Sequence, residues 1–179
     1  MTFPHPDMFK QPLWARTLPS SVVVNIATLG WLGRLKAPGT WGSAAGLAFY
    51  TVVFYPMKPL GVVLLTALIL YLALVFCGEA ETRLQQVDPP SVILDEFAAI
   101  PICFVGLQSA LDTKFAWAVF LAGFLLFRLF DIWKPFGIRA LQRYRGGLGV
   151  VVDDVAAAAA TCILLNLGVW WLVPWLMRS

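Results

Sequence analysis

The sequence has very little of the side-chain chemistry on which most soluble hydrolases rely. It contains one histidine, His5, and three cysteines, and only 13% of its 179 residues are charged. A lone histidine near the proline-containing start argues against a histidine nucleophile and against a histidine-ligated zinc site. Cys77, Cys103 and Cys162 are isolated in apolar stretches, so they form no CxxC metal pair and no evident disulfide framework.

Several short catalytic signatures are also missing. The sequence has no Cys-x5-Arg loop, which excludes a thiolate phosphatase, and no DxDx[TV] motif of the aspartyl-phosphate type. The GxxxxGK[ST] spacing of a nucleotide-binding phosphate loop is absent as well. The net charge of +3 is small and scattered, which argues against nucleic-acid binding. Carboxylate and hydroxyl oxygens remain as the available ligands.

Apolar residues are abundant. They make up 60% of the sequence, and the mean hydropathy is +0.79, whereas a soluble domain is about half apolar and about one quarter charged. A bilayer-spanning helix needs about 20 residues that are mostly apolar. We therefore expect an all-α, polytopic membrane helical bundle with about five transmembrane helices. The expected crossings are 44–56, 59–78, 97–111, 115–127 (which runs on into Arg128 and Asp131) and 155–177.

The N-terminal region is expected to be separate from this bundle. Residues 1–20 have no long apolar core, so we interpret them as a cytoplasmic tail and not as a secretory signal peptide. Residues 21–179 are then a single membrane-embedded domain. Within it, the stretch 22–32 is too short to span and is expected to lie at the interface or to re-enter the membrane.

The basic residues predict the orientation. With five crossings and an N-terminus inside, the outer segments carry only Lys58, Lys114 and Arg178, which leaves ten of the 13 lysines and arginines inside. The positive-inside rule therefore predicts a cytoplasmic N-terminus. Nine of the ten acidic residues fall on the same side, Asp112 being the exception. The polar chemistry is thus expected at the cytoplasmic face.

Six inner carboxylates gather where apolar segments begin or end. They are Asp88, Asp95, Glu96, Asp131, Asp153 and Asp154. Carboxylates beside a membrane core are costly unless they are paired or hold a cation, and oxygen ligands suit Mg²⁺ or Mn²⁺. The alternative for Asp95 and Glu96 is favourable charge at a helix N-terminus. The roles of Glu79 and Asp88 stay open.

A turn rich in glycine precedes the first expected crossing. Residues 36–43 read Lys-Ala-Pro-Gly-Thr-Trp-Gly-Ser and open directly into an apolar helix. Thr40 or Ser43 can cap this helix, and the amides at its N-terminus favour an anion, to which Lys36 adds a positive charge. The alternative is an ordinary capped turn.

A third polar segment runs from residue 128 to residue 154. Arg128, Asp131 and Lys134 are spaced so that neighbours meet on one helical side, either beside a substrate or as a structural ion-pair ladder. Pro135 should stop that helix. A flexible turn, Gly-Gly-Leu-Gly at 146–149, then leads to Asp153 and Asp154 before an apolar helix. Cations, carboxylates and a phosphate-type turn together indicate metal-assisted attack of water on a phosphate.

Four segments taken in order resemble the phosphatidylglycerophosphatase A family. They are residues 36–43, Leu-Asp-Glu-Phe at 94–97, Phe-Arg-Leu-Phe-Asp-Ile-Trp-Lys-Pro at 127–135 and Gly-Gly-Leu-Gly-Val-Val-Val-Asp-Asp at 146–154. The resemblance covers residue 22 to the C-terminus. It implies a Mg²⁺-dependent lipid phosphatase of the bacterial inner membrane, which hydrolyses the terminal phosphate monoester of phosphatidylglycerophosphate to phosphatidylglycerol. Ala99 and Ala158 stand where this family commonly has glycine, and Gly137 and Gln142 replace a usual proline and a frequent acidic residue.

On this interpretation the candidate site residues fall into two groups. The metal ligands would be Asp95, Glu96, Asp131, Asp153 and Asp154. Four of these, Asp95, Glu96, Asp131 and Asp154, are also the catalytic candidates, and which of them acts as a base is left open. The residues that would bind the substrate phosphate are Lys36, Thr40, Ser43, Arg128 and Lys134.

Two other functions use similar residues. A cation or proton-coupled transporter could use the same carboxylates, although the clear spans carry no charge in mid-membrane and no internal repeat is visible. A CDP-alcohol phosphotransferase also uses aspartates and Mg²⁺ at a membrane, but its long Asp-Gly-x2-Ala-Arg-type signature is not found here. The phosphatase is therefore the favoured prediction.

Overall fold

The computed structural model describes residues 11–134 and 147–176, and this part of the chain consists of helices joined by turns and loops, with no strand. The expected all-α class is confirmed for the described residues. Predictions that rest on residues 1–10, 135–146 or 177–179, among them those for His5, Pro135, Gly137, Gln142 and Gly146, lie outside them.

Three helices are long and apolar enough to cross a membrane. They are α4 (Pro59–Leu84), α7 (Ala116–Trp133) and α9 (Gly147–Leu176), whose most apolar stretches have mean hydropathies of 2.8, 1.7 and 2.0. At about 1.5 Å per residue, the 26 residues of α4 exceed the roughly 30 Å hydrocarbon core of a bilayer. The count of about five transmembrane helices is not confirmed, because the other two expected spans take different forms.

The first expected span begins earlier than the apolar pattern indicated. Helix α3 (Pro38–Phe49) starts with a proline in its first turn, a position that needs no intrahelical N–H, and continues into the π-helical turn η2 (Tyr50–Phe54). Its N-cap is Ala37, in the left-handed region at φ 54°, without a side-chain cap. The expectation that Thr40 or Ser43 caps the helix is therefore wrong. Both residues lie inside it because Pro38 already sets its start.

The span expected at 97–111 is broken into two pieces. Helix α5 (Leu94–Cys103) contains Pro101, which lacks a backbone N–H and favours an early end. The chain then turns at Gly106, where φ is +80°, and makes the single turn α6 (Gln108–Leu111). Helix α5 is thus a short helix inside the bundle.

The N-terminal part forms short helices that lie against α4. They are α1 (Leu13–Arg16), α2 (Ser20–Ala27) and the 3-10 turn η1 (Leu32–Arg34). Val23 and Ala27 of α2 are fully buried in a cluster with residues of α4. The N–H of Ile93 donates to the carbonyl of Ala27 (3.0 Å), which ties α2 to the start of α5.

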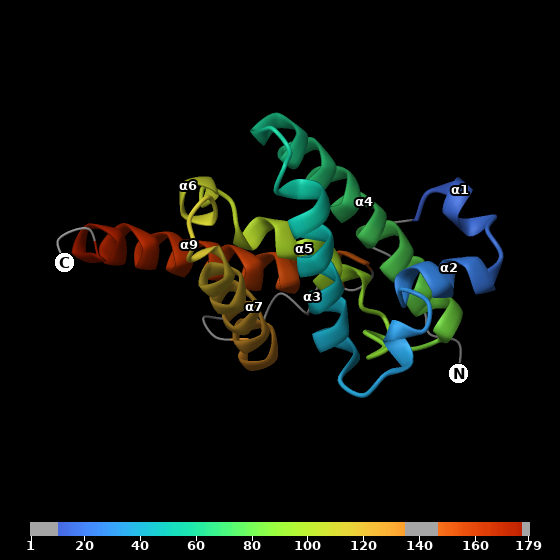
Figure 1. Ribbon diagram of the computed structural model, residues 1–179. Coiled ribbons are helices and arrows are strands. Elements are labelled where there is room, and N and C mark those ends of the chain that lie inside the picture. Colours follow the sequence, from blue (N-terminus) through green and yellow to red (C-terminus); the bar gives the residue numbers. More distant parts are fainter. Residues whose placement is uncertain (1–10, 135–146, 177–179) are drawn as a thin grey trace.

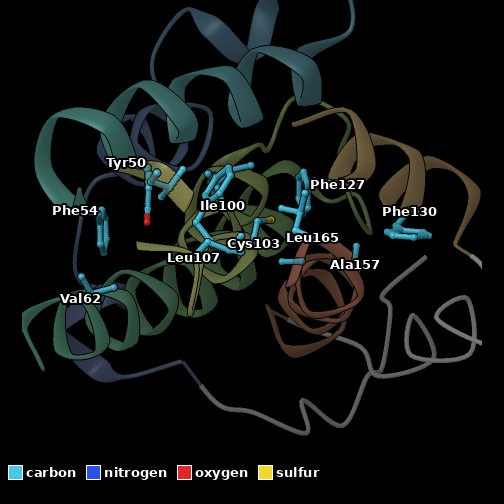
Figure 2. Close-up of a cluster of buried hydrophobic side chains, with 14 residues drawn as sticks. Tyr50, Phe54, Val62, Ile100, Cys103, Leu107, Phe127, Phe130, Ala157 and Leu165 are labelled. Atoms are coloured by element: carbon cyan, nitrogen blue, oxygen red, sulfur yellow. The ribbon is translucent and has the colours of Figure 1, made fainter. Parts of the chain in front are cut away.

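Helix α5 occupies the centre of the arrangement and contacts α3, α4, α7 and α9 (Figure 1). Its apolar half is fixed by a cluster of buried side chains to which η2, α4, α7 and α9 contribute (Figure 2). The ring of Phe104 lies 4.8 Å from that of Tyr50 and packs where Gly123 of α7 leaves room: a Cβ there would be 2.6 Å from the ring. With this end fixed, the acidic first turn of α5 is held in a defined place.

The turns of the bundle separate into two groups. The hydroxyl of Tyr55, after η2, donates to Asp112 Oδ1 (2.9 Å), after α6, so the two segments expected outside the membrane meet. The start of α3, the start of α5, the end of α7 and the first turns of α9 meet at one cavity instead. The segments that the charge pattern assigned to one side therefore lie together.

Candidate metal and phosphate site

A cavity of about 240 Å³ lies where these helix ends meet. Its polar lining consists of six carboxylates and two cations: Asp88, Asp95, Glu96, Asp131, Asp153, Asp154, Arg128 and Lys134. Ala37, Pro38, Gly39, Pro90, Val92 and Val150 complete the wall. The structure thus brings together all five predicted metal ligands from α5, α7 and α9, which lie far apart in the sequence.

Helix α5 contributes Asp95 and Glu96 from its first turn, where the helix dipole favours negative charge. Asp95 is only 5% exposed, and among the described residues its Oδ1 and the Oε2 of Glu96 have no hydrogen-bond partner. Acidic residues in the first turn of a solvent-exposed helix would not be buried and would not leave buried oxygens without a partner.

Helix α7 contributes a cation held between carboxylates. Arg128 Nη1 donates to Asp131 Oδ2 at 2.7 Å and lies 3.5 Å from Glu96 Oε1. It also approaches the hydroxyl of Ser43 on α3 (3.4 Å). The predicted ladder is formed only in part, because Lys134 pairs with Asp153 of α9. These contacts join α3, α5, α7 and α9 through charged groups.

Helix α9 carries Asp153 and Asp154 in a different setting from the one expected. The sequence indicated a flexible glycine turn ahead of these residues, but the helix already begins at Gly147, so both aspartates lie inside it. They are 4% and 3% exposed, and Asp154 Oδ2 has no partner among the described residues. Tertiary contacts with α4, α5 and α7 outweigh the helix cost of glycine, which is about 1 kcal/mol per residue.

The backbone around the cavity is strained at three points. Ala37, Asp88 and Lys134 all line it, and all adopt left-handed φ values, of 54°, 48° and 45°. Such conformations cost roughly 1–3 kcal/mol each and concentrate at functional sites. Asp88 is held there because its N–H donates to Glu81 Oε1 (2.7 Å). Asp88, whose role the sequence left open, is thus part of the cavity wall.

Other residues considered from the sequence lie away from the cavity. Glu79 pairs with Arg83 at 2.8 Å, and Arg83 also donates to Ser20 Oγ, so this pair connects α4 to α2. Lys36 is exposed and Thr40 is half-buried, and neither lines the cavity. Ser43 is fully buried, donates to the Gly39 carbonyl (2.8 Å) and reaches the site only through Arg128.

The start of α3 therefore meets the cavity through residues that have no polar side chain. Ala37, Pro38 and Gly39 form that part of the wall. Sequence reasoning missed Gly39 and Gly42 as site residues, although a signal was available. Gly39, Gly42 and Gly46 are spaced i, i+3, i+7, which places three residues without side chains on one helix face.

The donor set fits a divalent cation by chemistry and by charge. Six carboxylates face two cations, an excess of four negative charges when all are ionised, and buried like charges favour a bound cation. The unpartnered oxygens of Asp95, Glu96 and Asp154 are hard donors of the kind that Mg²⁺ prefers. No group of three Asp, Glu, His or Cys side chains within the described ranges is already arranged to hold a metal ion. Side-chain adjustment would accompany binding.

Fold and site together define a helical protein with membrane-length apolar helices. At one end of its bundle is a cavity lined by carboxylates and by the basic side chains of Arg128 and Lys134. The sequence model of the family described as Phosphatidylglycerophosphatase A matches residues 25–169. The chain therefore belongs to the phosphatidylglycerophosphatase A family, which places it among the phosphoric monoester hydrolases.

Individual relatives agree with this assignment. The chain is 33% identical over 138 residues to the phosphatidylglycerophosphatase A of Haemophilus influenzae, covering 76% of this chain and 82% of the relative. It is 31% identical over 137 residues to that of Escherichia coli K12, covering 75% and 76%. A protein of Bacteroides thetaiotaomicron named "Putative phosphatidylinositol-3-phosphatase" is 32% identical over 138 residues, covering 75% and 84%. No solved structure matches.

Proposed function

We propose that this protein hydrolyses the terminal phosphate monoester of phosphatidylglycerophosphate to phosphatidylglycerol and inorganic phosphate, with Mg²⁺ as cofactor, at the cytoplasmic face of the bacterial inner membrane. The observation that carries the proposal is the cavity itself. It combines unpartnered buried carboxylate oxygens, two cations and the N-terminus of α3. Family membership and the names of the Haemophilus and Escherichia relatives support the substrate.

The cations would bind the substrate phosphate. Arg128 and Lys134 line the cavity, and the Nε of Arg128 is a buried donor without a partner among the described residues. This N–H can donate to a phosphate oxygen while Nη1 remains on Asp131. The N-terminus of α3 at Gly39 lies beside it and favours the same negative charge. We propose that Lys36, Thr40 and Ser43 act less directly, through the electrostatic field at the cavity and through the packing of α3.

One of the carboxylates would accept a proton from the attacking water. The bond between the water oxygen and phosphorus forms as the bond from phosphorus to the glycerol oxygen breaks, and that oxygen leaves with a proton. Asp95, Glu96, Asp131 and Asp154 are the candidates to accept the proton of the water. Among them, Asp95, Glu96 and Asp154 carry buried oxygens without a hydrogen-bond partner among the described residues, and such an oxygen can accept that proton.

Mg²⁺ would be held by the cavity carboxylates Asp95, Glu96, Asp131, Asp153 and Asp154, and when bound it supplies Lewis-acid stabilisation of charge on the phosphate oxygens. The residues themselves hold the phosphate, exclude water from the buried walls and position the base.

The cavity also limits which part of the lipid enters it. A volume of about 240 Å³ lies below the roughly 300–1,000 Å³ range of pockets that enclose whole drug-sized ligands. A phosphorylated glycerol headgroup is small enough to enter, whereas acyl chains are not. We propose that the chains stay in the bilayer beside the apolar helices.

For the topology we propose five crossings: α3 with η2, then α4, then the discontinuous pair α5 and α6, then α7 and α9. Discontinuous helices are an established way to build a polar site within a membrane protein. The meeting of Tyr55 with Asp112 at one end and of the cavity residues at the other supports this order. The excess of Lys and Arg on the cavity side supports the cytoplasmic placement.

The Bacteroides relative favours a second substrate from the same chemical class, a phosphoinositide bearing a phosphate monoester. The chemistry at phosphorus would be the same, and only the alcohol would differ. The transporter alternative has less support, because the carboxylates gather in a cavity at one end of the bundle among the described residues.

The test is phosphate release by purified protein in detergent micelles. Phosphatidylglycerophosphate, phosphatidylinositol 3-phosphate and phosphatidic acid would each be supplied with Mg²⁺ and with EDTA. Mg²⁺-dependent release from the first substrate alone is expected. Release only from the phosphoinositide would reassign the substrate. Release from none would reject the phosphatase proposal. Any release must come from hydrolysis, because micelles hold no gradient that could drive a transporter.

A further inference from the structure

We propose that Gly39 and Gly42 form a slot in α3 that seats the Glu96 carboxylate against Arg128, and that Gly39 is a positioning residue for the reaction. The inference rests on the proposed function, since it takes Glu96 and Arg128 as parts of the phosphatase site. It assigns a role to two residues that carry no functional side chain.

The distances define the slot. A Cβ on Gly39 would lie 2.0 Å from Glu96 Oε1 and 2.9 Å from Arg128 Nη1. A Cβ on Gly42 would lie 3.1 Å from Glu96 Oε2 and 2.8 Å from the carbonyl oxygen of Ile93. Both oxygens of one carboxylate therefore rest against α3 where side chains are missing, and Arg128 contacts the same place.

The slot determines where the carboxylate can point. Glu96 Oε1 lies 3.5 Å from Arg128 Nη1, and Oε2 is buried without a hydrogen-bond partner among the described residues. A methyl group at Gly39 would force Oε1 to move by more than 1 Å to reach ordinary van der Waals contact, which begins at 3.4 Å. A misplacement of about 1 Å in a catalytic group can cost about 10²-fold in rate.

The third glycine of the row provides a contrast within the same helix. A Cβ on Gly46 would lie 2.8 Å from the carbonyl oxygen of Phe97 and 2.9 Å from Ile100 Cγ1, which are backbone and core atoms. Gly46 thus sets the spacing of α3 and α5, and Gly42, with the Ile93 carbonyl oxygen at 2.8 Å, shares this role. The three atoms nearest to a Cβ on Gly39 are instead all side-chain atoms of Glu96 and Arg128. Gly168, in α9, has nothing within 4 Å of an added Cβ and serves as a neutral control.

The experiment compares Gly39→Ala, Gly46→Ala and Gly168→Ala. For each purified variant we would measure Tm, the affinity for Mn²⁺ by electron paramagnetic resonance, and kcat and KM for phosphatidylglycerophosphate. Gly39→Ala is expected to lower kcat about 10²-fold and to weaken Mn²⁺ binding, with a Tm close to that of Gly168→Ala. Gly46→Ala is expected to lower Tm. Wild-type kcat and Mn²⁺ affinity in Gly39→Ala, or a fall in its Tm equal to that of Gly46→Ala, would overturn the proposal.

A double-mutant cycle separates positioning from general damage. Aspartate is one methylene shorter than glutamate, so Glu96→Asp withdraws the carboxylate from the slot. In the Glu96→Asp background, Gly39→Ala should lower kcat less than about threefold, because residues in direct contact are energetically coupled. An undiminished 10²-fold loss there would contradict the slot.

Failure of the proposed function is recognised separately. A wild-type protein that binds Mn²⁺ but releases no phosphate would reject the function and leave the slot to be judged by Mn²⁺ affinity in the same variants. A wild-type protein that neither binds Mn²⁺ nor releases phosphate would overturn both.

Discussion

Lys134, the residue that ends α7, forms an ion pair with Asp153, which lies inside α9. The two residues are 19 positions apart and lie on different helices. Both line the cavity. The pair therefore holds a cation at the wall of a site with excess negative charge, where a phosphate would otherwise be repelled.

Replacing Lys134 with methionine keeps an unbranched, flexible side chain that is one atom shorter, but removes its charge. We expect kcat/KM for phosphatidylglycerophosphate to fall about 10²-fold, the cost usually seen when a donor to developing charge is removed. Phosphate release measures the effect. Lys114→Met is the matched control, because Lys114 is exposed at the opposite end beside Phe115. An equal loss in both variants would contradict a local role.

Asp95→Asn and Asp154→Asn should each abolish phosphate release. Each change keeps the shape of the side chain and removes a buried charge with an unpartnered oxygen. Because like charges crowd the cavity, Tm in the absence of metal is expected to stay the same or to rise. Thermal unfolding and phosphate release would be measured together, with Asp112→Asn as the control at the other end. Full turnover by either variant would remove that residue from the site.

Metal removal should affect stability as well as activity. EDTA is expected to stop phosphate release, and added Mg²⁺ or Mn²⁺ to restore it. Because the ion would bind the folded protein and relieve carboxylate repulsion, Tm should rise with metal concentration. The rise should be absent in Asp154→Asn. A Tm that does not respond to Mg²⁺, Mn²⁺ or EDTA would count against a metal site in the cavity.

The affinity for the metal should depend on pH in a defined direction. A cation binds carboxylates in their ionised form, so protons compete with it for the buried oxygens of Asp95, Glu96 and Asp154. The apparent affinity for the cation should therefore fall as the pH decreases, by up to about tenfold per pH unit for each proton displaced. Mn²⁺ titrations in a series of buffers of decreasing pH would show this. Glu96→Gln should flatten the profile, and an unchanged slope would assign the proton to another group.

The proposed topology predicts opposite accessibility for two lysines. Lys36 is exposed and precedes Ala37, the first residue of the cavity wall, and Lys114 follows α6 at the other end. In a variant whose native cysteines are replaced by alanine, Lys36→Cys should react with an impermeant maleimide only after the cells are opened. Lys114→Cys should react from outside. The reverse pattern would place the site on the outer face.

Composition and charge pattern predicted much of this protein without a structure. Apolar runs predicted the all-α class and the three long helices, because backbone groups in a membrane must satisfy their hydrogen bonds within the helix. Five of the six cavity carboxylates and the pair of Arg128 and Lys134 were recognisable from their place at the ends of apolar stretches, whereas the role of Asp88 stayed open. These signals are local in the sequence, and the cost of exposing charge to hydrocarbon makes them clear.

Only the tertiary structure decided how the segments meet. The start of α9 ahead of Asp153 and the pairing of Lys134 with α9 depend on contacts between helices that no local pattern encodes. The same holds for Gly39 and Gly42, whose importance lies in what approaches them. The sequence thus determines which charged groups are present, whereas helix packing determines the distances between them. The reason is that each side chain is positioned by its own helix, and each helix is held by the helices packed against it.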